Sequence, residues 1–427
     1  MKAELPGPVD LSLGDAGKSK KGLTTAQQRI LWLLVLSAWL NFIDRGALSA
    51  AAPALKVELG LTPVELGYLL SAFFWTYAGC QVITGWLADR FNVARLFAVG
   101  FLVWSSSVLL TGFAGTFAWL FALRLVLGMG ESTAYPSYAR ILSRDFPEHR
   151  RGLANALIDA ASKTGPGVAT FAGALIISAF GWRTMYLVFG AVGLLWLPFW
   201  IRWAPREQRR PDASPSGPGM GMILSRGTPW ATFAGLFCFN YAYFFLVTWL
   251  PSYLVMERHF SMHRMAVFGG LPFIVCGGTS AAAGWISDAW IANGATPNRA
   301  RKTFAVSGLL ICAATLPALA LATDTAAMVL LMVSFFAIGL FTSNVWTITQ
   351  SLAGPEAAGK WTGLQNAIGN LGSVVAPIVT GLIVAATGGR FFLAFVAASA
   401  GLLIAAAMYL LGIGRIEPLR WTVEEFQ

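Results

Sequence analysis

Charged residues are scarce in this chain. Asp, Glu, Lys and Arg together make up 12% of its 427 residues, about half the share found in ordinary soluble proteins. The hydrophobic share is 56%, above the roughly 45–50% of soluble proteins. This composition argues against a water-soluble globule. The formal net charge is +10, but the charges stand in short loops between apolar runs, so we predict no nucleic-acid partner.

Residues that perform chemistry are also few. The three histidines (His149, His259 and His263) lie in predicted loops, and the four cysteines lie within apolar runs without CxxC spacing. The stretch GDAGKS at residues 14–19 is shorter than a Walker A loop and follows no predicted strand. No nucleophile, base and orienting residue stand together in the apolar runs. We therefore predict no enzyme, no metal site, no ATP-driven step and no cofactor.

Long apolar runs fill most of the chain. Each reaches about the 20 residues that a helix needs to cross about 30 Å of hydrocarbon. They are continuously apolar, which favours helices over the alternating strands of a barrel. We predict an all-α membrane protein with twelve transmembrane helices, over residues 28–52, 66–88, 94–113, 117–140, 153–179, 184–203, 228–254, 266–290, 303–322, 326–352, 361–386 and 390–413.

The segment between the sixth and seventh runs is rich in Pro, Gly, Ser and Arg, which is typical of a mobile linker. The first 24 residues are polar, and the apolar run after them is too long for a signal-peptide core. The predicted organisation is a flexible cytoplasmic tail (1–24), an N-terminal six-helix bundle (25–203), a cytoplasmic linker (204–226), a C-terminal six-helix bundle (227–414) and a second cytoplasmic tail (415–427).

The positive charges indicate the orientation. Of the 30 Lys and Arg residues, 22 lie on the side of the membrane that holds both termini, five on the other side and three within spans. Because loops rich in Lys and Arg stay in the cytoplasm, both termini are expected there. We predict an integral, multi-pass protein of the plasma (inner) membrane.

An internal repeat supports the division into two halves. GWLADR, at Gly85–Arg90, closes the second span, and GWISDA, at Gly284–Ala289, closes the eighth. A basic loop follows each copy. Repeats of six helices around a site at the membrane midplane are a known transporter architecture.

These motifs resemble those of the major facilitator superfamily. The first copy matches its signature between the second and third helices through Arg95, although Asn92 and Val93 stand where the family has a glycine. NFIDRGALSAAAP in the first span and RLVLGMGESTAYPS in the fourth resemble the anion:cation symporter branch, which carries sugar acids and other organic anions and includes the vesicular glutamate and sialic-acid carriers. The resemblance implies two pseudo-symmetric six-helix bundles, and a monomer is the family's default.

Ionisable residues inside a span cost at least about 2.5–3.5 kcal/mol each and are therefore expected to be functional. Glu131 lies two turns after Arg124, beyond Gly128 and Gly130, which permit close helix packing. A carboxyl in this apolar setting is suited to exchanging a proton. The alternative is a structural ion pair with Arg124 or with an arginine of another helix. Six such residues stand well inside spans: Asp44, Arg45, Arg124, Glu131, Asp159 and Lys163.

Asp44 and Arg45 are adjacent, so their side chains point about 100° apart on a helix, and each needs its own environment. We expect Arg45 to bind the substrate carboxylate from the central cavity and Asp44 to take a proton. The resemblance implies the same roles, with Asp44 and Glu131 as the proton-coupling acids. For Arg45, a packing or topological role remains the alternative.

Asp159 and Lys163 have the spacing of a helical ion pair. Lys163 could instead attract the anion, and Arg124 could either bind substrate or organise the fourth helix. In the C-terminal half, Gln365, Asn366 and Asn370 offer neutral groups to a polyhydroxylated acid or join helices. Tyr77 resembles a cavity tyrosine of the branch, and simple packing is the alternative.

Asp89, Arg90 and Asp288 lie at the cytoplasmic rim, and Gly85 belongs to the same signature. We predict that they form a conformational latch in which Asp89 meets a helix N-terminus or one of the arginines Arg144, Arg150 and Arg151. Purely topological loop charges are the alternative.

The predicted function is import of a small organic anion, a sugar acid such as a hexonate or hexuronate, with protons by alternating access. A proton-independent exchanger or facilitator of the same fold is the alternative. A cation exporter is disfavoured because Arg45 and Lys163 would repel its cargo. A receptor that does not transport is disfavoured because no predicted cytoplasmic segment is large enough to fold as a signalling domain.

Overall fold

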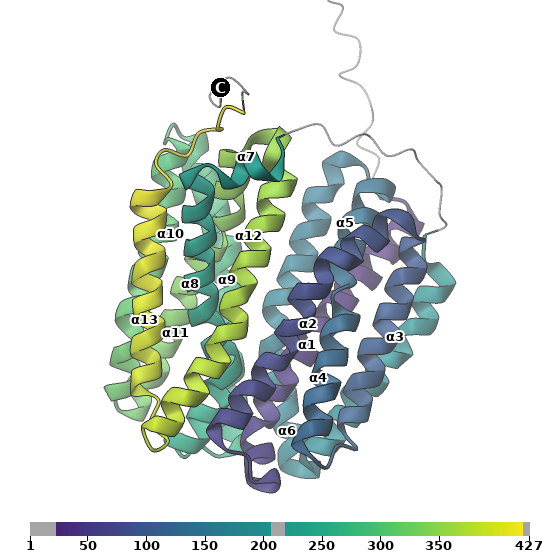
Figure 1. Ribbon diagram of the computed structural model, residues 1–427, viewed down its shortest axis with the longest axis vertical. Helices are drawn as coiled ribbons and strands as arrows, with labels where there is room; N and C mark the ends of the chain where they lie inside the picture. Colours follow the sequence, from purple (N-terminus) through teal and green to yellow (C-terminus); the bar gives the residue numbers. More distant parts are fainter. Residues whose placement is uncertain (1–22, 206–217, 422–427) are drawn as a thin grey trace, which may run out of the picture.

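The computed structural model describes residues 23–205 and 218–421, and every regular element in this part of the chain is a helix (Figure 1). The helices are α1 (Thr25–Leu59), α2 (Pro63–Arg90), α3 (Val93–Thr111), α4 (Phe117–Glu131), α5 (Ala134–Asp145), α6 (Glu148–Trp203), α7 (Met220–Leu224), α8 (Gly227–Ser252), η1 (Tyr253–Glu257), α9 (Met262–Ala292), α10 (Pro297–Leu321), α11 (Asp324–Thr342), α12 (Val345–Ala386), α13 (Phe392–Ala407) and η2 (Met408–Gly412).

Some helices contain more than one predicted span. Among the described residues, nine helical stretches are long and apolar enough to cross a membrane, and one of them, Arg150–Trp203, is 54 residues long. It turns at Gly181, where φ is 82°, and so contains the fifth and sixth predicted spans. Helix α12 turns likewise at Gly354, where φ is 66°. With α2 and the α4–α5 segment, these stretches account for the twelve predicted spans.

The fourth and tenth predicted spans are each interrupted by short polar residues. Helix α4 ends before Ser132 and Thr133, whose hydroxyls donate to the carbonyls of Met129 and Gly130 at 2.7 and 2.8 Å. Helix α11 ends before Ser343, whose hydroxyl donates to the carbonyl of Leu340 at 2.8 Å. Such bonds to the preceding turn bend helices. The break after α4 places Glu131 at the end of its helix.

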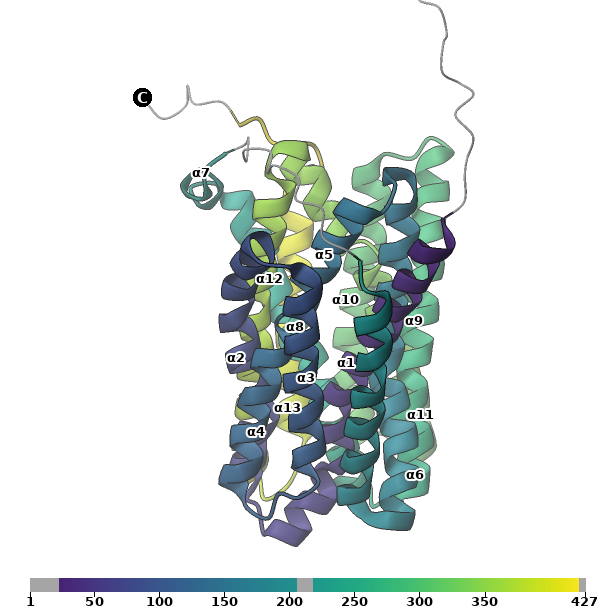
Figure 2. The ribbon, with the colours of Figure 1, turned by 90° about the vertical axis from the view of Figure 1, so that its right-hand side faces the viewer.

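Helices α1–α6 gather in one group and α8–α13 in a second beside it (Figure 1). We call these the N-terminal group and the C-terminal group. Figure 2 shows that the long helices run along one direction, as membrane-crossing helices must. The end of the molecule opposite the start of α1 is called the far end below.

The two groups pack together near the far end, where small residues let their backbones approach. A Cβ atom on Gly67 of α2 would lie 2.6 Å from the carbonyl oxygen of Pro377 in α12. A Cβ atom on Gly167 of α6 would lie 2.8 Å from the carbonyl oxygen of Gly270 in α9. The Ser71 hydroxyl also donates to the carbonyl of Val374 at 2.6 Å. Glycines therefore allow backbone contact between α2 and α12 and between α6 and α9.

Candidate substrate and proton site

Asp44 and Arg45 of α1 have separate environments, as predicted. Both residues are buried, with exposed fractions of 4% and 8%. The indole Nε1 of Trp104 in α3 donates to Asp44 Oδ2 at 3.1 Å. Arg45 points to α4 instead. Sequence reasoning did not single out Trp104, because nothing in a sequence shows which helix faces Asp44.

Arg45 forms a buried ion pair with Glu131. Its Nε lies 2.9 Å from Glu131 Oε2, and the two side chains are 7% and 0% exposed. The guanidinium carbon lies 4.3 Å from the ring centroid of Tyr77 and 4.5 Å from that of Phe42. The predicted substrate-binding cation and a predicted proton-coupling acid are therefore partners in this conformation.

The two glycines before Glu131 bring α4 close to its neighbours, as predicted. A Cβ atom on Gly128 would lie 2.3 Å from the carbonyl oxygen of Phe73 in α2, and one on Gly130 would lie 2.8 Å from the carbonyl oxygen of Gly100 in α3. No side chain larger than hydrogen fits at either position without a shift of backbone. This close packing holds Glu131 between α1, α2 and α3.

Several polar atoms around the ion pair have no hydrogen-bond partner among the described residues. They are buried, which makes each one costly unless water or a ligand satisfies it. The atoms are Arg45 Nη2, Glu131 Oε1, Asn41 Nδ2 and Oδ1, and Arg124 Nε and Nη1. The site is thus only partly satisfied in this conformation.

Arg124 does not pair with Glu131. Of the two ion-pair partners that the sequence-based alternative allowed, the structure shows the arginine of another helix. The Arg124 guanidinium carbon lies 5.2 Å from the ring centroid of Phe73. The ion-pair partner is Arg45, which comes from another helix and satisfies one Glu131 oxygen. Arg124 still contributes positive charge close to both Asp44 and Glu131.

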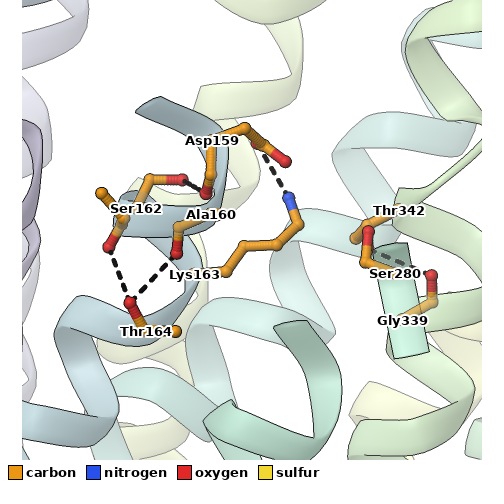
Figure 3. Close-up of polar contacts among 9 residues, drawn as sticks. Asp159, Ala160, Ser162, Lys163, Thr164, Ser280, Gly339 and Thr342 are labelled. Carbon is orange, nitrogen blue, oxygen red and sulfur yellow. Dashed lines mark hydrogen bonds and ion pairs between the residues drawn. The ribbon is translucent and has the colours of Figure 1, made fainter. Parts of the chain in front are cut away.

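The predicted ion pair between Asp159 and Lys163 is present on α6. The Lys163 ammonium lies 2.9 Å from Asp159 Oδ1 (Figure 3). The Asp159 side chain is 57% exposed, whereas that of Lys163 is 17% exposed. A charged pair this accessible inside a span requires water rather than lipid around it.

A chain of polar contacts joins Tyr77 to the C-terminal group. Gln81 Nε2 donates to the Tyr77 hydroxyl at 3.0 Å, and Asn366 Nδ2 of α12 donates to Gln81 Oε1 at 3.4 Å. Gln81 was not predicted as a site residue, although its position one helical turn after Tyr77 was a usable signal. Tyr77 and Asn366 therefore belong to one connected set.

The other two candidates from α12 are not joined to this set by a hydrogen bond. Gln365 is fully buried, and its Oε1 accepts from the Thr349 hydroxyl at 2.7 Å, while its Nε2 has no partner among the described residues. Asn370 is also buried, with 8% exposed. In this conformation, the Gln365 amide bonds within the C-terminal group.

The predicted latch residues lie near the helix ends away from the far end. Asp288 Oδ1 lies 3.3 Å from Arg301 Nη2, within the C-terminal group. The Arg90 guanidinium carbon lies 4.4 Å from the ring centroid of Trp86. In the described part of the chain, nothing lies within 4 Å of a Cβ atom placed on Gly85. The side chain of Asp89 falls outside the described part of the structure.

Buried, partly unsatisfied charges among membrane-spanning helices are typical of secondary transporters. The model of the Major Facilitator Superfamily matches residues 34–377, and the chain belongs to this family. The predicted fold class and family are confirmed, and the chain is a membrane transporter rather than an enzyme.

Curated relatives are similar over nearly their whole length. The chain is 32% identical to the "Probable sulfoacetate transporter SauU" of Cupriavidus necator, with 84% of this chain and 87% of the relative covered. It is 30% identical to the "Probable galactarate/D-glucarate transporter GarP" of Escherichia coli K12, with coverage of 95% and 98%. It is 27% identical to the "D-galactonate transporter" of E. coli CFT073, with coverage of 91% and 95%.

Solved structures show the same fold. A bacterial homolog of the human lysosomal transporter Spinster, in an inward-facing and occupied conformation, aligns with a TM-score of 0.79 at 19% identity, covering 94% of this chain and 100% of that chain. The same homolog in an inward-facing and unoccupied conformation aligns with a TM-score of 0.77 at 19% identity, covering 92% and 98%.

Proposed function

We propose that this transporter imports a small organic anion, in the first place a sugar acid, together with protons by alternating access. The ion pair between Arg45 and Glu131 carries the proposal, because each partner keeps a buried polar atom that has no hydrogen-bond partner within residues 23–205 and 218–421. The relatives named for galactarate, D-glucarate and D-galactonate support the substrate class.

In the proposed cycle, Glu131 and the substrate compete for Arg45. Protonation of Glu131 removes the negative charge that holds Arg45 Nε. The guanidinium fork is then free to bind the substrate carboxylate through two parallel hydrogen bonds. Loss of the proton lets Glu131 take Arg45 back, which releases the anion. Asp44 is the second proton carrier.

The substrate body is proposed to lie between the two groups of helices. The Tyr77 ring stacks against the Arg45 guanidinium. Gln81 links the Tyr77 hydroxyl to Asn366 of the C-terminal group through hydrogen bonds. A polyhydroxylated acid needs several neutral hydrogen-bonding groups once its carboxylate is held. The further proposed binding residues are Arg124, Lys163, Gln365 and Asn370.

The orientation follows from the charge distribution. If the side rich in Lys and Arg is cytoplasmic, both termini lie there, and the far end faces outward across the plasma (inner) membrane. The packing of Gly67 and Gly167 at the far end then closes the outer side. Gly85, Asp89, Arg90 and Asp288 are proposed to latch the opposite, outward-open state. The carrier is proposed to act as a monomer.

Uptake into liposomes tests this function. Purified protein should accumulate labelled galactonate or glucarate when the outside is made acidic. Glu131→Gln should weaken accumulation driven by the proton gradient, because Asp44 is then the remaining proton carrier, but keep exchange of labelled for unlabelled substrate. Glu417→Gln is the control, because Glu417 is an exposed acid near the end of the chain. Exchange that ignores the gradient in the unmodified protein would establish the proton-independent carrier instead.

A further inference from the structure

The ion pair of α6 faces the C-terminal group. The Lys163 Cβ lies 3.8 Å from the position that a Cβ atom would take on Gly277 in α9. Figure 3 shows the Lys163 side chain reaching from α6 toward Ser280 and Thr342, with its ammonium turned back to Asp159. The Thr342 hydroxyl donates to the Ser280 hydroxyl at 3.3 Å. Charged and hydroxyl groups thus face each other across the boundary between the groups.

The two members of this ion pair differ in their contact with solvent. More than half of the Asp159 side chain is exposed, while Lys163 is mostly covered. An ammonium has three donors, and among the described residues Asp159 supplies its one hydrogen-bond acceptor. Because Asp159 is exposed to solvent, it can leave Lys163 and stay solvated. Another anion can therefore take its place on the Lys163 ammonium at little cost in free energy.

The Asp159–Lys163 pair and the Arg45 site lie within electrostatic range of the same two phenols. The Tyr135 hydroxyl is influenced by the charges of both Arg45 and Asp159. Tyr243 of α8 is influenced by the same two residues from the C-terminal group. Tyr135 is 36% exposed. Arg45 and the ion pair that holds Lys163 therefore both influence one region that contains neutral hydroxyls.

Charge balance indicates what fits between these cations. With all six ionised, the three acids Asp44, Glu131 and Asp159 cancel the three bases Arg45, Arg124 and Lys163. Protonation of Asp44 and Glu131 leaves two positive charges in excess. Uncompensated charge inside a membrane protein is expensive. An anion with two negative charges restores neutrality, whereas one with a single charge does not.

We propose that Lys163 binds a second acidic group of the substrate and that Asp159 is its counter-ion in the empty carrier. The transporter therefore selects organic anions with acidic groups at two positions, such as dicarboxylates or sulfocarboxylates, over acids with one. This inference rests on the proposed function and narrows its substrate class.

The clean test is the double variant Asp159→Asn/Lys163→Gln, which removes the ion pair without changing net charge. Lys163→Gln alone would leave the Asp159 charge facing every anion. The probes are D-glucarate and D-gluconate, which differ only in the second terminal carboxylate. In the unmodified protein, glucarate should bind about 10- to 100-fold more tightly, as expected for one charge-assisted interaction.

In the double variant, the preference for glucarate should fall at least about tenfold, because the charge-assisted contact of Lys163 with the second carboxylate is lost. Gluconate lacks that carboxylate, so its binding should be retained, and this shows that the variant is folded. Asp159→Asn alone should bind glucarate at least as tightly as the unmodified protein. Neutralising the ion pair of the far end by Glu58→Gln/Arg183→Gln is the matched control, because its members are 44% and 42% exposed. That variant should keep the preference.

Two results would overturn the inference. Equal affinities for the two probes in the unmodified protein would do so, and so would an equal loss of both probes in the double variant. If the unmodified protein binds gluconate and transports it with protons, the proposed function stands even when this inference fails. Binding of neither probe, nor of sulfoacetate, would remove the proposed function and the inference together.

Discussion

Gly67→Ala should shift the carrier away from the conformation described here. The added Cβ would lie 2.6 Å from the carbonyl oxygen of Pro377 and 3.3 Å from the Cα of Gly381, and real Cβ atoms essentially never come within 3.0 Å of such neighbours. Both contacts are to backbone, so they are relieved only when α2 and α12 separate at the far end. Overpacking costs about 1–3 kcal/mol. A free-energy difference of about 1.4 kcal/mol changes an equilibrium constant tenfold. The ratio of far-end-open to far-end-closed molecules should therefore rise about 5- to 140-fold.

Distances between spin labels at Tyr68 and Leu382, two exposed positions on α2 and α12, measure this ratio in a cysteine-free background. Gly67→Ala should enlarge a population with a longer distance. Gly227→Ala is the control, because nothing lies within 4 Å of a Cβ atom at Gly227. An unchanged distance distribution in folded Gly67→Ala protein would refute the idea that backbone contact at the far end holds this state.

Two further substitutions separate stability from turnover. Arg258→Ala removes hydrogen bonds to the carbonyls of Leu319 and Ala322, both at 2.7 Å. Since each such bond contributes about 0.5–1.5 kcal/mol, this variant should lower the melting temperature by a few degrees. Arg264→Ala is the control, because Arg264 is exposed at the same end, and it should change the melting temperature less. Asp288→Asn should reduce the rate of transport more than it changes KM for substrate, and a change of KM alone would count against the latch.

The number and position of the spans were predictable because the bilayer sets the length of each apolar run. The breaks within the fourth and tenth spans were not. In the sequence, Ser132, Thr133 and Ser343 are small polar residues that a helix can accommodate. Their hydroxyl bonds to the preceding turn depend on local geometry that the sequence does not show. The role of Gly128 as a close-packing position was predictable, whereas its neighbour Phe73 depended on how α2 and α4 pack.

The candidate site was predictable as a set of residues but not as a set of partners. The Asp159–Lys163 pair follows from spacing on one helix. Arg45 and Glu131 are 86 positions apart, and no local rule relates them. Their pairing also changes the mechanism, because a cation first assigned to the substrate is held by the acid assigned to the proton. In the proposed cycle, the substrate role of Arg45 then depends on proton binding at Glu131.

Substrate affinity as a function of pH tests this dependence most directly. With purified protein and D-galactonate or D-glucarate, the affinity of the unmodified transporter should fall as the pH rises from about 5 to about 8, because fewer molecules carry the proton that binding requires. Glu131→Gln, which is permanently neutral, should bind at the higher pH about as tightly as the unmodified protein does at the lower one. Loss of binding in this variant at every pH, or an unchanged pH dependence, would contradict the account.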